Sequence, residues 1–393
     1  MRDRRTARFA DVVGRAHLPA LDGLRAVAVA AVIVGHADYP VRGVPADLGV
    51  SAFFVLSGFL ITRLLVREWN TTGDLSLSRF YLRRTMRIFP AYYAFLLLSF
   101  VIDRHQGQHW DWRLLASGVT YTVNYFNALH HHPNTSIAHA WSLAVEEQFY
   151  LVWPLLFLLL ARRGRHALVA GVTTLAVMAL AWRSVLGLWL HADTAYLYNA
   201  FDTRFDNLAV GCVFALLADR PSVARAVDNL AARPWRAWAT LGLLLVSRLA
   251  TPEAYHYSIG FTVDAVLVAL LIAQLLVLYR SWSWRWLEHP VMRYLGIISY
   301  PIYLYHAWGP SIARHLVPNT PAAIFTGGVV ATVLLAMGSY YVVERPFLRL
   351  KRRFEASPVR LPNGSAGAPM DSGPSSSTAM LPMTPVGERE GVR

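Results

Sequence analysis

Residues 18–37 read LPALDGLRAVAVAAVIVGHA, an apolar run that is interrupted near its start by Asp22 and Arg25 and that carries His36 at its end. A run of about 20 predominantly apolar residues is long enough to cross a bilayer as a helix. The arginines before this run give it the order of a secretory signal peptide, but charges interrupt it and further long apolar segments follow. The sequence therefore predicts a first transmembrane helix that is retained.

The whole composition agrees with a membrane protein. Of the 393 residues, 55% are hydrophobic and only 16% are charged, whereas a soluble globular domain carries about 25% charged residues. Further spans are expected at 48–66, 88–104, 147–161, 167–190, 205–218, 237–250, 259–279, 293–314 and 322–343. The sequence thus predicts an all-α fold, a polytopic integral membrane bundle with about ten transmembrane helices.

The distribution of arginine predicts the orientation of these helices in the cell membrane. The net charge of +13 is almost entirely arginine, because Lys351 is the only lysine. Arginines are concentrated in alternate connections, as the positive-inside rule expects of cytoplasmic loops. Both termini are then cytoplasmic, provided that residues 112–126 form a buried or re-entrant extracytoplasmic helix that does not cross. Topology accounts for the basic charge, so no nucleic acid partner is expected.

Three regions are expected along the chain: a cytoplasmic N-terminal segment at 1–17, a membrane domain at 18–347 and a cytoplasmic basic tail at 348–393. From Ala356 onward the tail is rich in Pro, Ser and Gly, which is typical of disorder. The single cysteine, Cys212, excludes internal disulfides and all-cysteine metal sites. The histidines at 130–132 and His139 lack the spacing of zinc ligands, so a solvated loop is expected there and no metal.

Ionisable residues make the first helix unlike a lipid-facing span. Arg25 and His36 are separated by eleven helical steps, about 20° more than three full turns, so they share one face about 16 Å apart along the axis. Arg25 is expected near the cytoplasmic end and His36 in the outer half of the bilayer. Charged groups at membrane depth face a protein interior or a wet cavity. The alternatives are an interhelical hydrogen bond for His36 and a snorkelling role for Arg25.

Two further segments carry candidate site residues. In the segment 49–59, Gly49, Ser57 and Gly58 lie among aromatic residues, and such small residues let helices pack closely. In the segment 80–90, Arg84 and Arg87 are neighbours on one helical face and follow Arg83. Paired guanidinium groups suit phosphate, which they bind in bidentate fashion. Lipid headgroups are phosphates too, so membrane anchoring is an equal interpretation of this motif taken alone.

Later segments add carboxylates and a second histidine at membrane depth. Glu146 and Glu147 lie at the mouth of a span, and adjacent helical residues point about 100° apart. At most one of the two is therefore expected to face the same cavity as His36, where it would orient the imidazole or hold the acceptor. Arg204 and Asp206 enter another span, and the run Ser-Tyr-Pro-Ile-Tyr-Leu-Tyr at 299–305 leads to His306.

Taken in order, these motifs resemble the membrane-bound acyltransferase 3 family, which includes bacterial O-acetyltransferases of surface polysaccharides and macrolide O-acyltransferases. The resemblance extends from Leu18 to about Phe347. The motifs that carry it are Leu21-Asp-Gly-Leu-Arg25 leading to His36, Gly49 through Phe59, Phe80 through Pro90, Trp141 through Tyr150, Arg204-Phe-Asp206 and Glu344-Arg-Pro346.

The resemblance implies an acyl-CoA donor, with acetyl-CoA as the expected co-substrate and no permanently bound cofactor, and an acceptor hydroxyl that is commonly on a carbohydrate. It assigns essential roles to Arg25 and His36, maps the arginine pair to Arg84 and Arg87, and maps the acidic position best to Glu146. Relatives often carry an additional extracytoplasmic SGNH hydrolase domain, which this sequence is not expected to contain.

The function expected from the sequence is transfer of an acyl group from cytoplasmic acyl-CoA to a hydroxyl. Arg84 and Arg87 would hold the CoA phosphates, Arg25 would guide the donor, and His36 would act as base or as transient acyl carrier. A polar cavity is expected to be lined by Asp22, Ser57, Arg204, Asp206 and His306. The acceptor is left open between a carbohydrate, a lipid-linked sugar and a macrolide, and the acyl chain length is open too. A proton-coupled transporter is the alternative of a different class.

Overall fold

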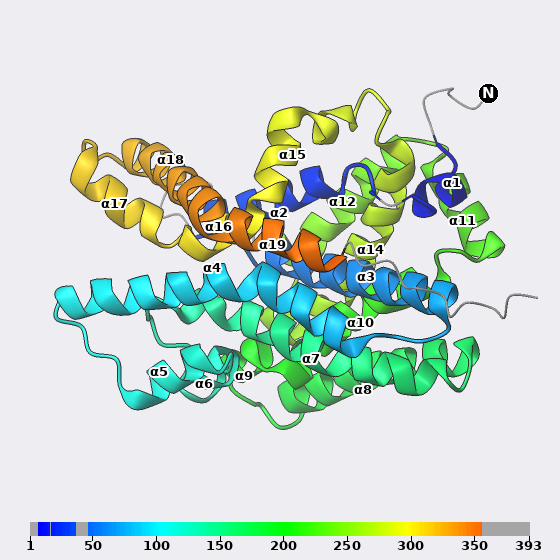
Figure 1. The fold of residues 1–393 in the computed structure, drawn as a ribbon, viewed down its shortest axis with the longest axis horizontal. Coiled ribbons are helices and arrows are strands. Elements are labelled where there is room, and N and C mark those ends of the chain that lie inside the picture. Colours follow the sequence, from blue (N-terminus) through cyan, green and yellow to red (C-terminus); the bar gives the residue numbers. More distant parts are fainter. Residues whose placement is uncertain (1–6, 16, 37–45, 356–393) are drawn as a thin grey trace, which may run out of the picture. The chain divides into compact units, whose positions relative to one another are not determined.

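The computed structural model describes residues 7–15, 17–36 and 46–355, and this part of the chain is helical without any strand (Figure 1). The chain divides into two units, residues 1–351 and 352–393, and the description below concerns the first. The tail predicted to be disordered from Ala356 onward lies outside the described residues. The predicted all-α membrane fold is confirmed by the helices themselves.

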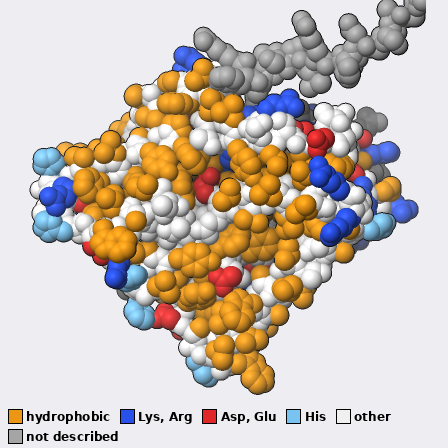
Figure 2. Space-filling view, turned by 60° about the horizontal axis from the view of Figure 1, so that its bottom comes forward, with side chains coloured by type: hydrophobic (Ala, Val, Ile, Leu, Met, Phe, Trp, Pro, Cys, Tyr) orange, Lys and Arg blue, Asp and Glu red, His pale blue; other side chains and the backbone are white. Residues whose placement is uncertain are grey.

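Among the described residues, six helical stretches are long and apolar enough to cross a membrane. They contain α3 (Ala46–Thr72), α4 (Leu77–His105), α7 (Trp141–Ala161), α8 (Arg165–Leu188), α14 (Phe261–Leu278) and α18 (Pro321–Ser339). Three of them extend through flanking elements: η1 (Ala138–Ala140) precedes α7, α13 (Glu253–Tyr255) and η2 (His256–Gly260) precede α14, and η4 (Tyr340–Glu344) and α19 (Arg345–Glu355) follow α18. On the face shown in Figure 2, hydrophobic side chains predominate, as lipid contact requires.

The predicted count of about ten spans is not confirmed. A seventh span results only if the stretch formed by α9 (Thr194–Asn199) and α10 (Phe201–Leu217) is joined to α11 (Pro221–Ala231), across a bend of 107°. Two other expected spans, α2 (Leu21–Gly35) and α12 (Trp235–Leu249), have 15 residues each, fewer than the roughly 20 that a bilayer needs. The short α1 (Phe9–Val13) belongs to the predicted N-terminal segment.

The expected span at 293–314 is broken into three helices. After η3 (Arg285–Glu288) the chain forms α15 (Pro290–Ile297), α16 (Ser299–Tyr305) and α17 (Trp308–Leu316). Pro290, Pro301 and Pro310 each lie in the first turn of one of these helices. A proline is tolerated there because its missing N–H would have no partner in the helix. The prolines therefore explain why an apolar stretch folds into short helices.

The segment 112–126, predicted not to cross the membrane, also consists of short helices. It forms α5 (Trp112–Val119) and most of α6 (Val123–Leu129), of 8 and 7 residues, and neither is long enough to cross. Between them Tyr121 adopts a positive φ of 55° while its ring stacks on that of Tyr92 at 4.0 Å. The side of the membrane on which this segment lies stays a prediction.

The packing of α3 places it between α2 and α10, and glycines permit the close approach. A Cβ atom built at Gly58 would lie 2.0 Å from the carbonyl oxygen of Leu208 in α10, and one at Gly211 would lie 2.2 Å from that of Val55 in α3. On the side of α2, a Cβ at Gly49 would lie 2.4 Å from the carbonyl oxygen of Ala28. The packing role predicted for Gly49 and Gly58 is confirmed.

We expect Gly58→Ala to destabilise the protein by about 1–3 kcal/mol, because the added methyl overlaps backbone that cannot rotate away. Gly242→Ala is the matched control, since no atom lies within 4 Å of a Cβ built at that position in α12. There the better helix propensity of alanine should stabilise by about 0.5–1 kcal/mol. Thermal unfolding in detergent measures both, and equal melting temperatures for the two variants would contradict the close contact.

Candidate active site

Most of the predicted site residues line one charged cavity of about 330 Å³, here called the arginine cavity. Side chains from α2, α3, α4, α7 and the segment after α18 meet there. Its charged residues are Asp22, Arg25, Arg84, Arg87, Glu146, Glu147 and Glu344, and Ser57 joins them from α3. The structure thus brings together both residues of the predicted arginine pair, Arg25 of the first helix and the predicted acidic residue.

The arginine pair lies on one face of α4, as its spacing predicts. Arg84 and Arg87 line the arginine cavity, whereas Arg83 does not and instead pairs with Glu68 at 3.2 Å. The guanidinium carbon of Arg84 lies 3.6 Å from the centroid of the Tyr150 ring, a cation–π distance. Stacking fixes the plane of Arg84 and leaves its edge available to a ligand.

A hydrogen-bonded group joins α3 to α7 in this cavity. The Ser57 hydroxyl donates to Oε1 of Glu146 at 2.9 Å. The Tyr150 hydroxyl lies 2.9 Å from Ser57 Oγ and 3.1 Å from Oε2 of Glu146, and it can donate to either. Glu146 is therefore held by two hydroxyls beneath the ring on which Arg84 stacks, so the position of the acid and that of the arginine are linked through Tyr150.

A second cavity of about 610 Å³, here called the histidine cavity, contains His36. Its histidines are His36, His132, His139 and His306, and its aromatic wall includes Trp141 and Tyr198. His36 directly follows α2 and its Nδ1 lies 2.8 Å from the carbonyl oxygen of Val32. A carbonyl only accepts, so Nδ1 donates and the lone pair is on Nε2. His36 is thereby equipped as a base.

A second imidazole ring lies beside that base, and a third lies beside the second. The centroid of the His306 ring lies 4.9 Å from that of His36 and 4.8 Å from that of His139. Nδ1 of His306 donates to the carbonyl of Tyr303 at 2.7 Å, and Nε2 of His139 donates to that of Leu304 at 3.0 Å. The expected solvated loop is wrong for His139, which is 8% exposed, because the 3-10 turn η1 carries it inward.

The two cavities adjoin, and Arg25 and His36 lie in different ones. Val50 and Tyr303 are the two residues that line both cavities. Both Glu146 and Glu147 line the arginine cavity and neither lines the cavity of His36. At most one of them is expected to face the cavity of His36, and in the structure neither does, because the start of α7 lies beside the arginine pair.

Arg204 and Asp206 line neither of these two cavities, contrary to the sequence-based expectation. Arg204 is fully buried, with its guanidinium carbon 3.6 Å from the centroid of Phe261 and further aromatic rings around it. Asp206 pairs with buried Arg183 at 2.8 Å. The reason is that α10 turns Arg204 toward α3 and α14, and Asp206 toward α8.

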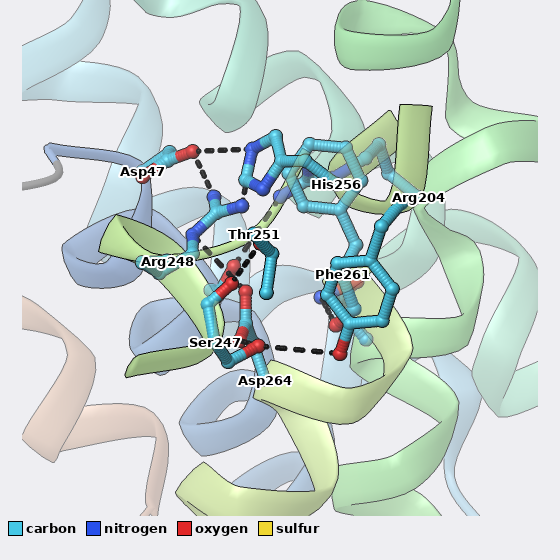
Figure 3. Close-up of polar contacts among 11 residues, drawn as sticks. Asp47, Arg204, Ser247, Arg248, Thr251, His256, Phe261 and Asp264 are labelled. Carbon is cyan, nitrogen blue, oxygen red and sulfur yellow. Dashed lines mark hydrogen bonds and ion pairs between the residues drawn. The ribbon is translucent and has the colours of Figure 1, made fainter. Parts of the chain in front are cut away.

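Near Arg204 lies a buried cluster of polar side chains, which is separate from both cavities and is shown in Figure 3. Its centre is Arg248 of α12, whose Nε lies 3.0 Å from Asp264 of α14. Arg248 also contacts Asp47 of α3 and His256 of η2, and Ser247 Oγ donates to Asp264 at 2.8 Å. The cluster fastens three helices away from both cavities. In the sequence, this cluster is signalled by Asp264, a carboxylate within an apolar span.

Sequence analysis gave no role to several residues that line the arginine cavity. Glu344 was part of a quoted motif without an assigned function, and its Oε1 is buried without a hydrogen-bond partner among the described residues. Tyr150 and Tyr303 stood in quoted runs too. Their role depends on which helix each faces, and the sequence contains no signal for that.

We expect Arg248→Met to destabilise the protein by about 3–5 kcal/mol, because it leaves the buried Asp264 carboxylate uncompensated. Arg225→Met is the matched control, since Arg225 is exposed and a change there should cost less than about 0.5 kcal/mol. Melting temperatures in detergent give both values. Adding Asp264→Asn to Arg248→Met should recover part of the loss, and no recovery would contradict the pairing.

Comparison with known proteins agrees with this geometry. The model of the acyltransferase 3 family, described as "Acyltransferase domain", matches residues 18–341. The chain is 28% identical to the peptidoglycan O-acetyltransferase OatA of Listeria monocytogenes, over 87% of this chain and 57% of that protein. It is 31% identical to a protein of Bacillus subtilis provisionally named peptidoglycan O-acetyltransferase YrhL, over 84% of this chain and 55% of that one.

A protein of Staphylococcus aureus provisionally named O-acetyltransferase is 28% identical, over 84% of this chain and 57% of its own length. The chain spans a little over half the length of these curated relatives. No solved structure matches it. Because the family match covers residues 18–341 of the 393, the chain belongs to the acyltransferase 3 family of membrane proteins.

Proposed function

We propose that this protein transfers an acyl group, as acetyl, from cytoplasmic acyl-CoA to a hydroxyl of a carbohydrate acceptor. The observation that carries the proposal is the pair of adjoining cavities, one lined by three arginines and the other containing a histidine with a free lone pair. An arginine-lined cavity suits the phosphates of CoA. A histidine base suits deprotonation of a hydroxyl.

The donor would enter through the arginine cavity. CoA carries several phosphate charges at one end and its thioester at the end of a long flexible arm. Arg84 and Arg87 would bind phosphate at the cytoplasmic side, which the arginine-rich loops define by the positive-inside rule. Arg25 lines the same cavity from α2, and it would attract the donor toward the base. With this orientation both termini are cytoplasmic and the protein resides in the cell membrane.

The chemical step would take place beside His36. Nε2 of His36 takes the proton of the acceptor hydroxyl, the oxygen attacks the thioester carbonyl, and the C–S bond breaks to release CoA as thiolate. In the route with an acyl carrier, Nε2 itself attacks the thioester carbonyl, the C–S bond breaks and CoA leaves as thiolate. The acceptor oxygen then attacks the acyl carbon, the C–N bond breaks to restore Nε2, and the hydroxyl proton passes to the thiolate. Both routes need a lone pair on Nε2, and in the neutral ring the bond from Nδ1 to Val32 places it there.

The carbohydrate acceptor is proposed from the relatives and the cavity together. Two relatives have names that assign peptidoglycan as acceptor. The histidine cavity is large enough for a sugar unit, and Trp141 and Tyr198 provide aromatic faces in its wall. Nothing in the geometry favours a macrolide acceptor over a carbohydrate.

The first test is release of the free CoA thiol from acetyl-CoA by purified protein in detergent, with peptidoglycan fragments as acceptor. We expect His36→Ala to lower the rate at least about 100-fold, because it removes the base. His130→Ala is the control, since His130 is exposed and lines neither cavity. Mass spectrometry of the fragments identifies the acetylated product. Solute transport by reconstituted protein without release of CoA would contradict an acyltransferase.

A second test addresses the arginine pair. We expect Arg87→Ala to raise the KM for acetyl-CoA about 10- to 100-fold, because a charge-assisted bond to phosphate contributes about 1.5–3 kcal/mol. The matched control is Arg83→Ala, whose side chain pairs with Glu68 instead. Acetyl-pantetheine lacks phosphate, so with this donor Arg87→Ala and wild type should have equal KM values. An increase in KM that persists with acetyl-pantetheine would rule out phosphate binding by Arg87.

A further inference from the structure

We infer that Val50 and Tyr303 form a partition that selects short acyl chains, so that acetyl passes from one cavity to the other and longer chains are excluded. This inference rests on the proposed function. It assigns a specificity-determining role to two residues that neither bind phosphate nor take the proton.

The partition follows from where the reacting groups lie. Arg84 and Arg87, which would hold the donor, line the arginine cavity, and His36 lines the histidine cavity. A base must come within hydrogen-bond reach of the reacting hydroxyl, at about 3 Å. The thioester carbonyl must therefore pass from the first cavity to the second. Val50 and Tyr303 line both, so the acyl group passes between or beside these two side chains.

Tyr303 is held firmly in place. Its hydroxyl donates to the backbone carbonyl of His139 at 2.9 Å and accepts from Ser142 Oγ at 2.6 Å. The ring also packs edge-on against Phe53, with centroids 6.3 Å apart. Turning the ring aside would break both hydrogen bonds in a buried environment, where unpaired polar groups are costly. The tyrosine side of the partition is thus rigid.

Val50 forms the other side and is equally constrained. It is 3% exposed and lies on α3 one residue after Gly49, where α3 and α2 make their close approach. The backbone there cannot retreat, and a valine has one strongly preferred side-chain rotamer in a helix. The width of the passage between the two cavities is therefore set by the side chains of Val50 and Tyr303, neither of which can move aside.

The volume of the histidine cavity does not limit the length of the acyl chain. The histidine cavity has a volume of about 610 Å³, against about 330 Å³ for the arginine cavity. Several methylene groups would fit there. A limit on acyl length consequently arises at the passage, and removing two methyl groups from Val50 should relax it.

The test compares the kcat/KM for hexanoyl-CoA with that for acetyl-CoA, both followed by release of CoA thiol. Wild type should favour acetyl-CoA strongly. We expect Val50→Ala to raise the hexanoyl-to-acetyl ratio about tenfold, and Tyr303→Phe, which keeps the ring but loses its anchoring hydroxyl, to raise it as well. Val329→Ala is the matched control, because Val329 lines only the histidine cavity, and it should leave the ratio unchanged.

A ratio is insensitive to the amount of folded protein, so it separates selectivity from stability. If Tyr303→Phe does not fold, Val50→Ala decides alone. The inference is overturned if wild type uses hexanoyl-CoA as well as acetyl-CoA, or if Val50→Ala turns over acetyl-CoA at an unchanged ratio. In both cases the acyltransferase proposal stands. Wild type that releases no CoA from either donor overturns the proposed function and the inference with it.

Discussion

The close approach of α3 to its two neighbours is the constraint on which the rest of the site depends. Gly49 meets the backbone of α2, and Gly58 meets that of α10. Between these contacts α3 has almost no freedom to shift, so Val50 and Ser57 are fixed where the cavities form. Within lipid the hydrophobic effect does not drive helices together, so close packing at small residues supplies the attraction between them. The positions of the side chains that line the cavities therefore depend on the backbone contacts of α3 with α2 and α10.

Burial of charge follows two different patterns in this protein. Arg248 and Arg183 each face a buried carboxylate, Asp264 in one case and Asp206 in the other. Such pairs are expensive to break and therefore hold helices together. In the arginine cavity the arginine side chains line open space, where an anionic ligand can pair with them. The difference separates structural arginines from those available for binding.

Sequence reasoning identified the membrane class, the family and the arginines of the arginine cavity, because these depend on composition and on spacing within single helices. Arg84 and Arg87 share a face for that reason. It did not find that Arg25 and His36 open into different cavities, or that Arg204 is enclosed by aromatic rings, since these depend on which helices meet. The predicted number of spans is not confirmed, and hydropathy does not reveal where proline divides a segment.

That division has a chemical consequence. The last turn of a helix has carbonyl groups without partners, and ending α16 at Tyr305 places those of Tyr303 and Leu304 there. His306 and His139 use them, so each ring is committed to one tautomer, with its proton on the nitrogen that faces the backbone. A continuous helix would occupy both carbonyls and leave the rings free to exchange tautomers. The break in the chain therefore determines where protons reside around the reacting centre.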